Sequence, residues 1–473
     1  MSEYDVVVVG AGAVGENVAD YATQAGLSCV IVESDKVGGE CSYRACIPSK
    51  ALLRSGDARR AALAVDGAAQ AVTRGLDVAR VLARRDAFTG KGDDAGQVSW
   101  LEGAGVDLVR GQARLVAERT VEVERPEGTQ TLTARVAVAV CTGSEPTVPP
   151  IPGIDEIDVW TSREATIAED IPASLVVVGG GVVAAELATA FASLGSTVTV
   201  VARSGLLSGH EPIAGEAVTK RFRADGIDVL VADVDSVSAA GDGAQVRLST
   251  GQTVNADRVL VATGRTPRTS DVGIDTVGLT PGEWVDVDET MLVRGVPGEW
   301  LYAVGDLNHR SLLTHQGKYQ ARAAAAAIAA RAAGDVPDTH PWADATATAD
   351  HDAVPSVVFS SPQVAMVGMT ETAAMDAGRP VRTIDIALGS VAGGALHADG
   401  YEGTFRAVVD TERNVVIGVT LVGDDVAELL HAATIAVVGE VPLHRLWHAV
   451  PAFPTMSEAW LRMLEALRKP EAQ

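Results

Sequence analysis

Two cysteines with four residues between them are the clearest sign of chemistry in the sequence. Cys41 and Cys46 stand in the segment GGECSYRACIPSK, Gly38–Lys50. So short a loop can close into a disulfide, and the start of the helix expected after Cys46 would lower the pKa of a nearby thiol. Zinc is the structural alternative, but no second cysteine pair or histidine cluster completes a tetrahedral site. The pair predicts thiol–disulfide redox chemistry and no metal.

The other two cysteines, Cys29 and Cys141, lie in the apolar runs LSCVIVE and VAVAVCTG. We expect both to be buried, inert strand residues. An apolar strand expected at Tyr4–Val9 leaves no room for a signal peptide, which predicts a cytoplasmic protein. In that reducing compartment a close cysteine pair is more often catalytic or metal-binding than structural.

Length and composition narrow the class of protein. A chain of 473 residues is too long for one core and predicts two to four domains. The net charge of −24 disfavours binding to nucleic acid or to an anionic membrane. No window reaches the roughly 18 apolar residues that a membrane span requires. The Ala-rich run Ala321–Ala333 contains two arginines and reads as a packed helix.

The first forty residues read as strand, glycine turn, helix and strand. The strand Tyr4–Val9 precedes a GxGxxG turn, and a second strand, Ser28–Val32, ends at Glu33. The glycines of such a turn let the backbone approach a pyrophosphate, and the helix N-terminus meets its charge. The acid accepts hydrogen bonds from ribose hydroxyls. We therefore expect dinucleotide binding by Gly10, Gly12, Gly15 and Glu33.

The same pattern recurs at Ser174–Arg203, with Gly179, Gly181 and, in the third glycine position, Ala184. Here Arg203 stands beyond the second strand, where the first fold has an acid. A ribose 2′-phosphate is not repelled there, and Arg203 would pair with it. A solvated surface arginine is the alternative. This favours NADPH over NADH as the second nucleotide, with NADH still possible.

A third glycine-bearing segment, LYAVGDLNH at Leu301–His309, reads as a strand that ends near Gly305. Asp306 is then placed to hold a polar chain of a cofactor. The three segments together predict an α/β protein with two Rossmann-like domains that bind two dinucleotides.

Taken in order, these motifs resemble the class I pyridine nucleotide-disulfide oxidoreductases, the family of dihydrolipoamide dehydrogenase, glutathione reductase and mercuric reductase. The resemblance covers essentially the whole chain. It also includes CTGSEPTVPPIPG at Cys141–Gly153, VATGRTPRT at Val261–Thr269, LTHQGKYQA at Leu313–Ala321 and VPSVVFSSPQVAMVG at Val354–Gly368. It implies FAD, a homodimer and a C-terminal α+β dimerisation domain. The expected domains are FAD-binding at 1–150 and 270–345, NAD(P)-binding at 151–269 and the interface domain at 346–473.

The resemblance also implies roles for single residues. Cys46 would face the flavin as the charge-transfer thiolate, and Cys41 would meet the substrate. Lys50 and Glu186 match a family pair near the flavin N5; the alternative is two unrelated charged helix residues. The remaining cofactor-binding positions are Thr142, Gly143, Gly264, Asp306 and His315.

The chain departs from the family at its proton donor. Thiol–disulfide members supply a histidine from an H-P-T-x-x-E motif of the partner subunit. In PAFPTMSE, Pro451–Glu458, Phe453 holds that position although Glu458 is in register. His448 or His444 would take the role in a shifted register, or Glu458 would act through water if burial raised its pKa. The residues leave these alternatives open.

The cysteine motif departs as well. Family members commonly read C-x-N-x-G-C, whereas Tyr43 and Arg44 stand between the cysteines here. We expect these two side chains to reshape the substrate entrance, with Arg44 favouring the thiolate or an anionic substrate, or simply facing solvent.

These residues predict an NAD(P)H-dependent flavoenzyme that reduces a disulfide-type small-molecule acceptor through Cys41 and Cys46. A quinone or diaphorase activity, or metal-ion reduction by the flavin or the dithiol, is the alternative. Mercuric reductases also lack the histidine and use NADPH, but they carry a C-terminal cysteine pair. This chain ends in RKPEAQ, so we do not expect efficient mercuric reduction. A redox-sensing flavoprotein without turnover is the non-enzymatic alternative.

Overall fold

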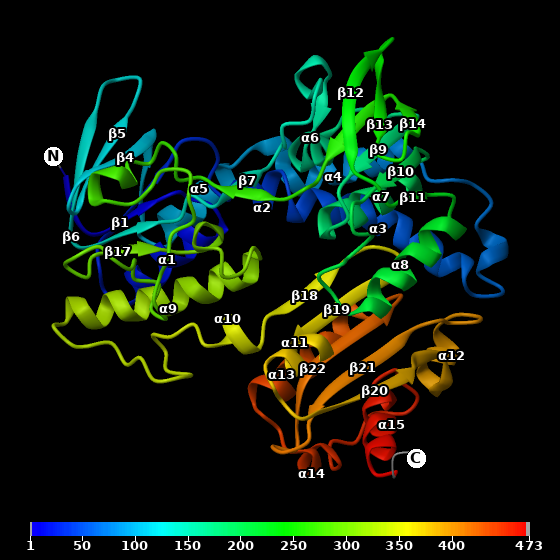
Figure 1. The fold of residues 1–473 in the computed structure, drawn as a ribbon. Helices are drawn as coiled ribbons and strands as arrows, with labels where there is room; N and C mark the ends of the chain where they lie inside the picture. Colours follow the sequence, from blue (N-terminus) through cyan, green and yellow to red (C-terminus); the bar gives the residue numbers. More distant parts are fainter. Residues whose placement is uncertain (1, 470–473) are drawn as a thin grey trace. The chain divides into compact units, whose positions relative to one another are not determined.

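The computed structural model describes residues 2–469, and its chain divides into two compact units (Figure 1). The first comprises the residues up to Pro48, then Arg85–Thr147 and Gly264–His351. The second comprises Ser49–Arg84, Val148–Thr263 and the residues from Asp352 onward.

A seven-stranded sheet forms the centre of the first unit. Its order is β3-β2-β1-β6-β5-β4, with β17 paired to β6; β4 and β5 are antiparallel and the others parallel. The strands are β1 (Ser2–Val9), β2 (Cys29–Glu33), β3 (Asp107–Arg110), β4 (Gln112–Ala117), β5 (Thr120–Glu124), β6 (Gln130–Val140) and β17 (Leu301–Ala303). The continuous apolar run of β1 suits a parallel strand that is covered on both faces.

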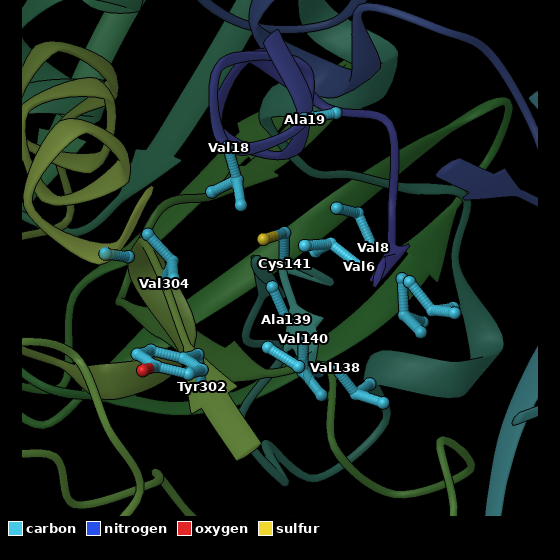
Figure 2. Close-up of a cluster of buried hydrophobic side chains, with 14 of the residues drawn as sticks. Val6, Val8, Val18, Ala19, Val138, Ala139, Val140, Cys141, Tyr302 and Val304 are labelled. Atoms are coloured by element: carbon cyan, nitrogen blue, oxygen red, sulfur yellow. The ribbon is translucent and has the colours of Figure 1, made fainter. Parts of the chain in front are cut away.

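The core of this unit lies between the sheet and its helices. Figure 2 shows side chains from β1, β6 and β17 packed with Val18 and Ala19 of helix α1 (Ala13–Gln24). Helix α9 (Thr314–Ala332) packs against α1 and contains most of the Ala-rich run, which confirms the packed helix. Cys29 and Cys141 are 2% and 6% exposed, so both are buried as expected.

Shorter elements of the first unit carry the cysteine pair. Cys41 lies in α2 (Gly39–Tyr43), and Cys46 begins α3 (Cys46–Leu63), which continues into the second unit. A two-stranded ribbon joins β7 (Ser144–Pro146) to β16 (Arg265–Pro267). Helix α5 (Ala95–Gly103) and all but the last residue of α10 (Ala349–Asp352) also belong to the first unit, whereas α4 (Val78–Thr89) begins in the second unit and enters the first at Arg85.

The second unit repeats the nucleotide fold. A parallel sheet has the order β11-β10-β9-β15-β8. It consists of β8 (Val159–Trp160), β9 (Ser174–Val178), β10 (Thr197–Val201), β11 (Asp228–Leu230) and β15 (Arg258–Val261), with helices α6 (Ser162–Ile167), α7 (Val182–Ser193) and α8 (Pro212–Ala224). An antiparallel sheet joins β12 (Val234–Ala240), β13 (Gly243–Leu248) and β14 (Thr253–Ala256).

The C-terminal part of the second unit is an antiparallel sheet of order β18-β19-β22-β21-β20. Its strands are β18 (Pro355–Val358), β19 (Gln363–Gly368), β20 (Val381–Ala387), β21 (Thr404–Asp410) and β22 (Val415–Gly423). The helices are α11 (Glu371–Asp376), α12 (Ala392–His397), α13 (Leu430–Val438), α14 (Leu443–Leu446) and α15 (Glu458–Leu467). Within residues 2–469, no helix is long and apolar enough to span a membrane.

Candidate active site

The first glycine turn is shaped to leave room for a ligand. Gly10 has φ +100°, and a Cβ there would lie 2.6 Å from the Cys141 carbonyl oxygen. A Cβ on Gly15 would lie 1.9 Å from the Gly10 carbonyl oxygen. Gly12 is different, because an added Cβ would meet nothing within 4 Å. Two glycines thus close the turn, while the third borders open space at the N-terminus of α1, as a pyrophosphate requires.

Glu33 stands at the end of β2 with its carboxylate already oriented. One oxygen accepts a hydrogen bond from the Ala11 amide at 2.7 Å, and the other accepts from the Asp35 amide at 2.7 Å. This places the acid beside the glycine turn, where a ribose that follows the pyrophosphate would lie. The first turn and Glu33 therefore fit the adenosine diphosphate part of FAD.

The second turn has the same construction. Gly179 has φ +134°, and a Cβ there would lie 2.2 Å from the Ala262 carbonyl oxygen. Gly181 borders open space, with nothing within 4 Å of an added Cβ, and α7 begins directly after it. Ala184 is fully buried in the third glycine position. This turn fits the pyrophosphate of a second dinucleotide.

Arg203 follows β10 by two residues and is exposed. Within the described part of the chain, no hydrogen bond or ion pair holds its guanidinium. A side chain in this state can turn toward an anionic ligand without giving up an existing partner.

The two redox candidates are held together as thiols. The Cys46 Sγ lies 3.3 Å from the Thr314 hydroxyl at the start of α9. A hydrogen bond with Cys46, and then burial, raise the pKa of the Cys41 thiol. The expected lowering by a helix N-terminus is therefore wrong for Cys41. The reason is that the hydrogen bond with Cys46 and burial both favour the protonated thiol, and the long helix α3 begins only at Cys46.

Lys50 and Glu186 form an ion pair, with Lys50 Nζ 2.6 Å from a Glu186 carboxylate oxygen. The other Glu186 oxygen accepts a hydrogen bond from the Phe359 amide at 3.0 Å. The Phe359 ring centroid also lies 5.0 Å from Lys50 Nζ. Glu186 is buried, and its two carboxylate oxygens are stabilised by the Lys50 ammonium and the Phe359 amide. Lys50 follows Cys46 by one turn of α3, which connects this pair to the thiols through a single helix.

Asp306 belongs to a polar cluster near the cysteine segment. It accepts a hydrogen bond from Ser144 at 2.5 Å, and burial raises its pKa against the effects of Ser144 and Arg265. Arg265 and Arg268 both donate to Glu40, at 2.7 and 2.8 Å. Because Glu40 precedes Cys41, these ion pairs fix α2 to the ribbon of β7 and β16. The sequence gives no signal that Glu40 and these two arginines are partners.

The remaining residues that the sequence predicts to bind a cofactor lie on loops and at one helix start in the first unit. Thr142 donates from its hydroxyl to the Arg268 carbonyl oxygen at 2.7 Å. Gly143 has φ +71° and Gly264 φ +152°, and an added Cβ at either would meet nothing within 4 Å. His315 is exposed in the first turn of α9.

Of the two residues expected to reshape the substrate entrance, Tyr43 is buried instead. Tyr43 is 5% exposed, and its hydroxyl donates to Gln97 at 2.7 Å. It is therefore a buried packing residue. Arg44 pairs with Asp35 at 2.7 Å, so its charge is already partnered.

The segment that would carry the family histidine presents an exposed aromatic ring. Phe453 is 77% exposed, and His448 and His444 are also exposed. Glu458 is 7% exposed; one of its oxygens pairs with Arg462, and the other is buried without a hydrogen-bond partner. No group of three or more potential metal ligands occurs among residues 2–469.

Comparison with known proteins assigns the chain to a family. Residues 4–331 match the family described as pyridine nucleotide-disulphide oxidoreductase, and residues 354–464 match the dimerisation domain of that family. A mercuric reductase from Acidithiobacillus ferrooxidans is 33% identical over 98% of this chain and 82% of the relative. A dihydrolipoyl dehydrogenase from Chlorobaculum tepidum is 33% identical over 97% of this chain and 95% of the relative.

Solved structures agree in fold. The HOCl-induced flavoprotein disulfide reductase RclA from Escherichia coli, as a Cu(II) complex, aligns with a TM-score of 0.84 at 23% identity, covering 99% of this chain and all of that one. The match to the dimerisation domain supports a homodimer. The chain is a member of the pyridine nucleotide-disulphide oxidoreductase family, an FAD-dependent enzyme that passes electrons from NAD(P)H to a disulfide-type acceptor.

Proposed function

We propose that this enzyme prefers NADPH and passes its electrons through Cys41 and Cys46 to a small disulfide. The observation that carries the proposal is the pair of hydrogen-bonded thiols, with Cys41 in α2 and Cys46 at the start of α3. Cys46 stands one turn before Lys50, which pairs with the buried Glu186. FAD, when bound, accepts hydride from the nicotinamide and delivers two electrons to the cysteine disulfide.

The two thiols have different environments, and this supports different roles. The raised pKa of Cys41 keeps the proton of the reduced pair on that sulfur, so the negative charge belongs on Cys46, at the helix start and beside the Thr314 hydroxyl. Cys41, once deprotonated, attacks the substrate disulfide and releases one thiolate. Cys46 then attacks the Cys41 sulfur, releases the second thiolate and restores the internal disulfide. The hydride of NADPH supplies the two electrons and one of the two hydrogens, and one proton from solvent completes the two product thiols.

The nucleotide preference rests on Arg203. Its exposed guanidinium stands where a carboxylate would repel a 2′-phosphate, and no described residue pairs with it. NADH remains a slower donor, because the turn at Gly179 and Gly181 recognises the pyrophosphate that both nucleotides share.

Three further assignments belong to this proposal. Residues 1–150 and 270–345 bind FAD, 151–269 bind NADPH, and 346–473 form the interface of the homodimer. Thr142, Gly143, Gly264, Asp306 and His315 contact FAD. A cytoplasmic location suits a centre that must return to its dithiol.

Anaerobic titration with NADPH and then NADH, followed by visible spectroscopy, tests the proposal. A broad band beyond the main flavin absorption after two electrons, absent in Cys46→Ser, is the expected result. Direct bleaching of the flavin in the wild-type enzyme, without that band, would overturn it. Cys141→Ser is the matched control, because Cys141 is a buried thiol of the same unit without a redox partner.

Reduction of metal ions is a second candidate, favoured by the mercuric reductases among the relatives and by Phe453 in place of an acid–base histidine. NADPH oxidation with Hg(II), with a small disulfide and with a quinone separates the acceptors. Cys41→Ala with Cys46→Ala should abolish disulfide reduction. Quinone reduction that persists in this double variant would mean that the flavin reduces the quinone directly.

A further inference from the structure

Lys318 is a cation close to the cysteine pair, and it lies in the segment Leu313–Ala321, where the sequence indicates no role for it. It lies on α9 four residues after Thr314, whose hydroxyl contacts Cys46, so both side chains share one face of the helix. Its charge acts to lower the pKa of Cys41. The side chain is half-buried, and no carboxylate of the described chain forms an ion pair with it.

Glu16 is the buried acid that faces Lys318 across the packing of α1 against α9. It follows Gly15 directly, is 9% exposed, and its Oε1 is buried without a hydrogen-bond partner. Burial raises the pKa of Glu16 to about 7, with Lys318 opposing the rise and Glu33 adding to it. Glu16 therefore changes charge in the physiological range.

The other charged groups around this cluster already have partners. Glu33 is held by two backbone amides, and Glu40 is held by Arg265 and Arg268. On α2, Tyr43 donates its hydroxyl to Gln97 and stays neutral, because burial raises its pKa to about 12. The ionisation of Glu16 is thus the event that changes the field of Lys318 at Cys41.

We propose that Lys318 stabilises the Cys41 thiolate from within the same subunit, and that Glu16 sets the strength of this effect. The inference rests on Cys41 being the thiol that attacks the substrate. Both residues act on the thiol through their charge and are positioning residues. The step they assist is the loss of the Cys41 proton to solvent, which leaves the thiolate for attack. With Phe453 at the histidine position, this charge takes over part of what an imidazolium of the partner subunit would supply.

The directions of the effects follow from the charges. Replacing Lys318 by a neutral residue removes the cation, so the pKa of Cys41 rises. Replacing Glu16 by Gln removes the anion that offsets Lys318, so the pKa of Cys41 falls. A nearby opposite charge shifts a pKa by about one unit or more. A purely structural role for the two residues would not give shifts of opposite sign.

The test is the pH dependence of Cys41 alkylation in the FAD-loaded enzyme. The enzyme is reduced anaerobically with NADPH, treated with iodoacetamide from pH 6 to pH 10, and the modified peptide is sequenced by mass spectrometry. Lys318→Gln should raise the midpoint by about one unit and Lys318→Arg should restore it; Glu16→Gln should lower it. Arg322→Gln is the matched control, because it removes an exposed cation one turn further along the same helix.

Unchanged midpoints in both Lys318→Gln and Glu16→Gln, or shifts of the same sign, overturn the inference. Failure of the proposed function looks different, because the wild-type enzyme would then lack the long-wavelength band on reduction. The comparison of Lys318→Gln with Lys318→Arg decides the matter by itself if Glu16→Gln does not retain FAD. A midpoint that follows charge supports the inference, and one that follows any change at position 318 refutes it.

Discussion

Breaking the ion pair of Lys50 and Glu186 is the perturbation whose cost the structure defines best. At 2.6 Å and an effective dielectric constant of about 20, two unit charges attract by about 6 kcal/mol. The Lys50 side chain is 37% exposed, so water screens the pair and about 2–3 kcal/mol remains. Lys50→Met would leave the Glu186 carboxylate, only 5% exposed, with the Phe359 amide as its remaining hydrogen-bond donor. We therefore expect the free energy of unfolding to fall by about 2–3 kcal/mol.

Urea unfolding of the FAD-saturated enzyme, followed by circular dichroism, measures this loss. A double-mutant cycle with Glu186→Gln isolates the coupling, because the neutral amide no longer leaves a buried charge. Lys220→Met is the matched control: its pair with Glu402, at 2.5 Å, has side chains that are 70% and 76% exposed. That control should cost no more than about 0.5 kcal/mol. A coupling energy near zero for Lys50 and Glu186 would refute the reasoning, whatever the single variants cost.

The other predictions concern nucleotide choice, proton transfer, the glycine turn and acid stability. Arg203→Ala should lower kcat/KM for NADPH by about 10–30-fold, the equivalent of about 1.5–2 kcal/mol, with little change for NADH in steady-state assays. Phe453→His should raise turnover with a disulfide and add a limb near pH ~6.5 to the pH–rate profile, whereas Phe453→Leu should not. Gly12→Ala should fold but lose FAD on gel filtration, whereas Gly10→Ala should be thermally unstable, because its Cβ would meet a backbone carbonyl. The hydrogen bonds of Asp94 hold its pKa below the usual value despite burial. Its stabilisation is therefore complete above the unfolded pKa and lost as pH falls through the folded pKa, so Asp94→Asn should flatten acid unfolding curves.

The nucleotide folds were predictable because their signals are local. Gly10 and Gly179 adopt positive φ angles that favour glycine, and a Cβ at either would meet a backbone carbonyl oxygen. The glycine spacing in the sequence therefore predicts both turns. The expected strand Tyr4–Val9 lies within β1. Parallel strands that are buried on both faces can be recognised in the sequence as continuous apolar runs.

The surroundings of the cysteines were not predictable in the same way. Glu40, Arg265 and Arg268 meet across more than 220 positions of sequence, and no periodicity reports such a contact. Tyr43 was expected at a substrate entrance because of its size, yet its position between two cysteines did not reveal which way the ring points. The Tyr43 hydroxyl donates a hydrogen bond to Gln97 on α5, and the ring is buried.

The corrected pKa of Cys41 changes how the missing histidine should be understood. A buried thiol that holds its proton tightly needs more help to become a nucleophile, so the loss of an acid–base histidine at Phe453 should be costly. The chain nevertheless keeps a buried, partly unsatisfied carboxylate at Glu458, about five residues after that position in the family motif. It also holds an unpaired cation, Lys318, beside Cys41 in the subunit's own fold. A centre assembled in this way would reduce best those acceptors whose leaving groups are stable anions, because they require little proton donation. Rates across disulfides of graded leaving-group pKa should therefore rise more steeply with falling pKa than in Phe453→His, where a proton donor is restored.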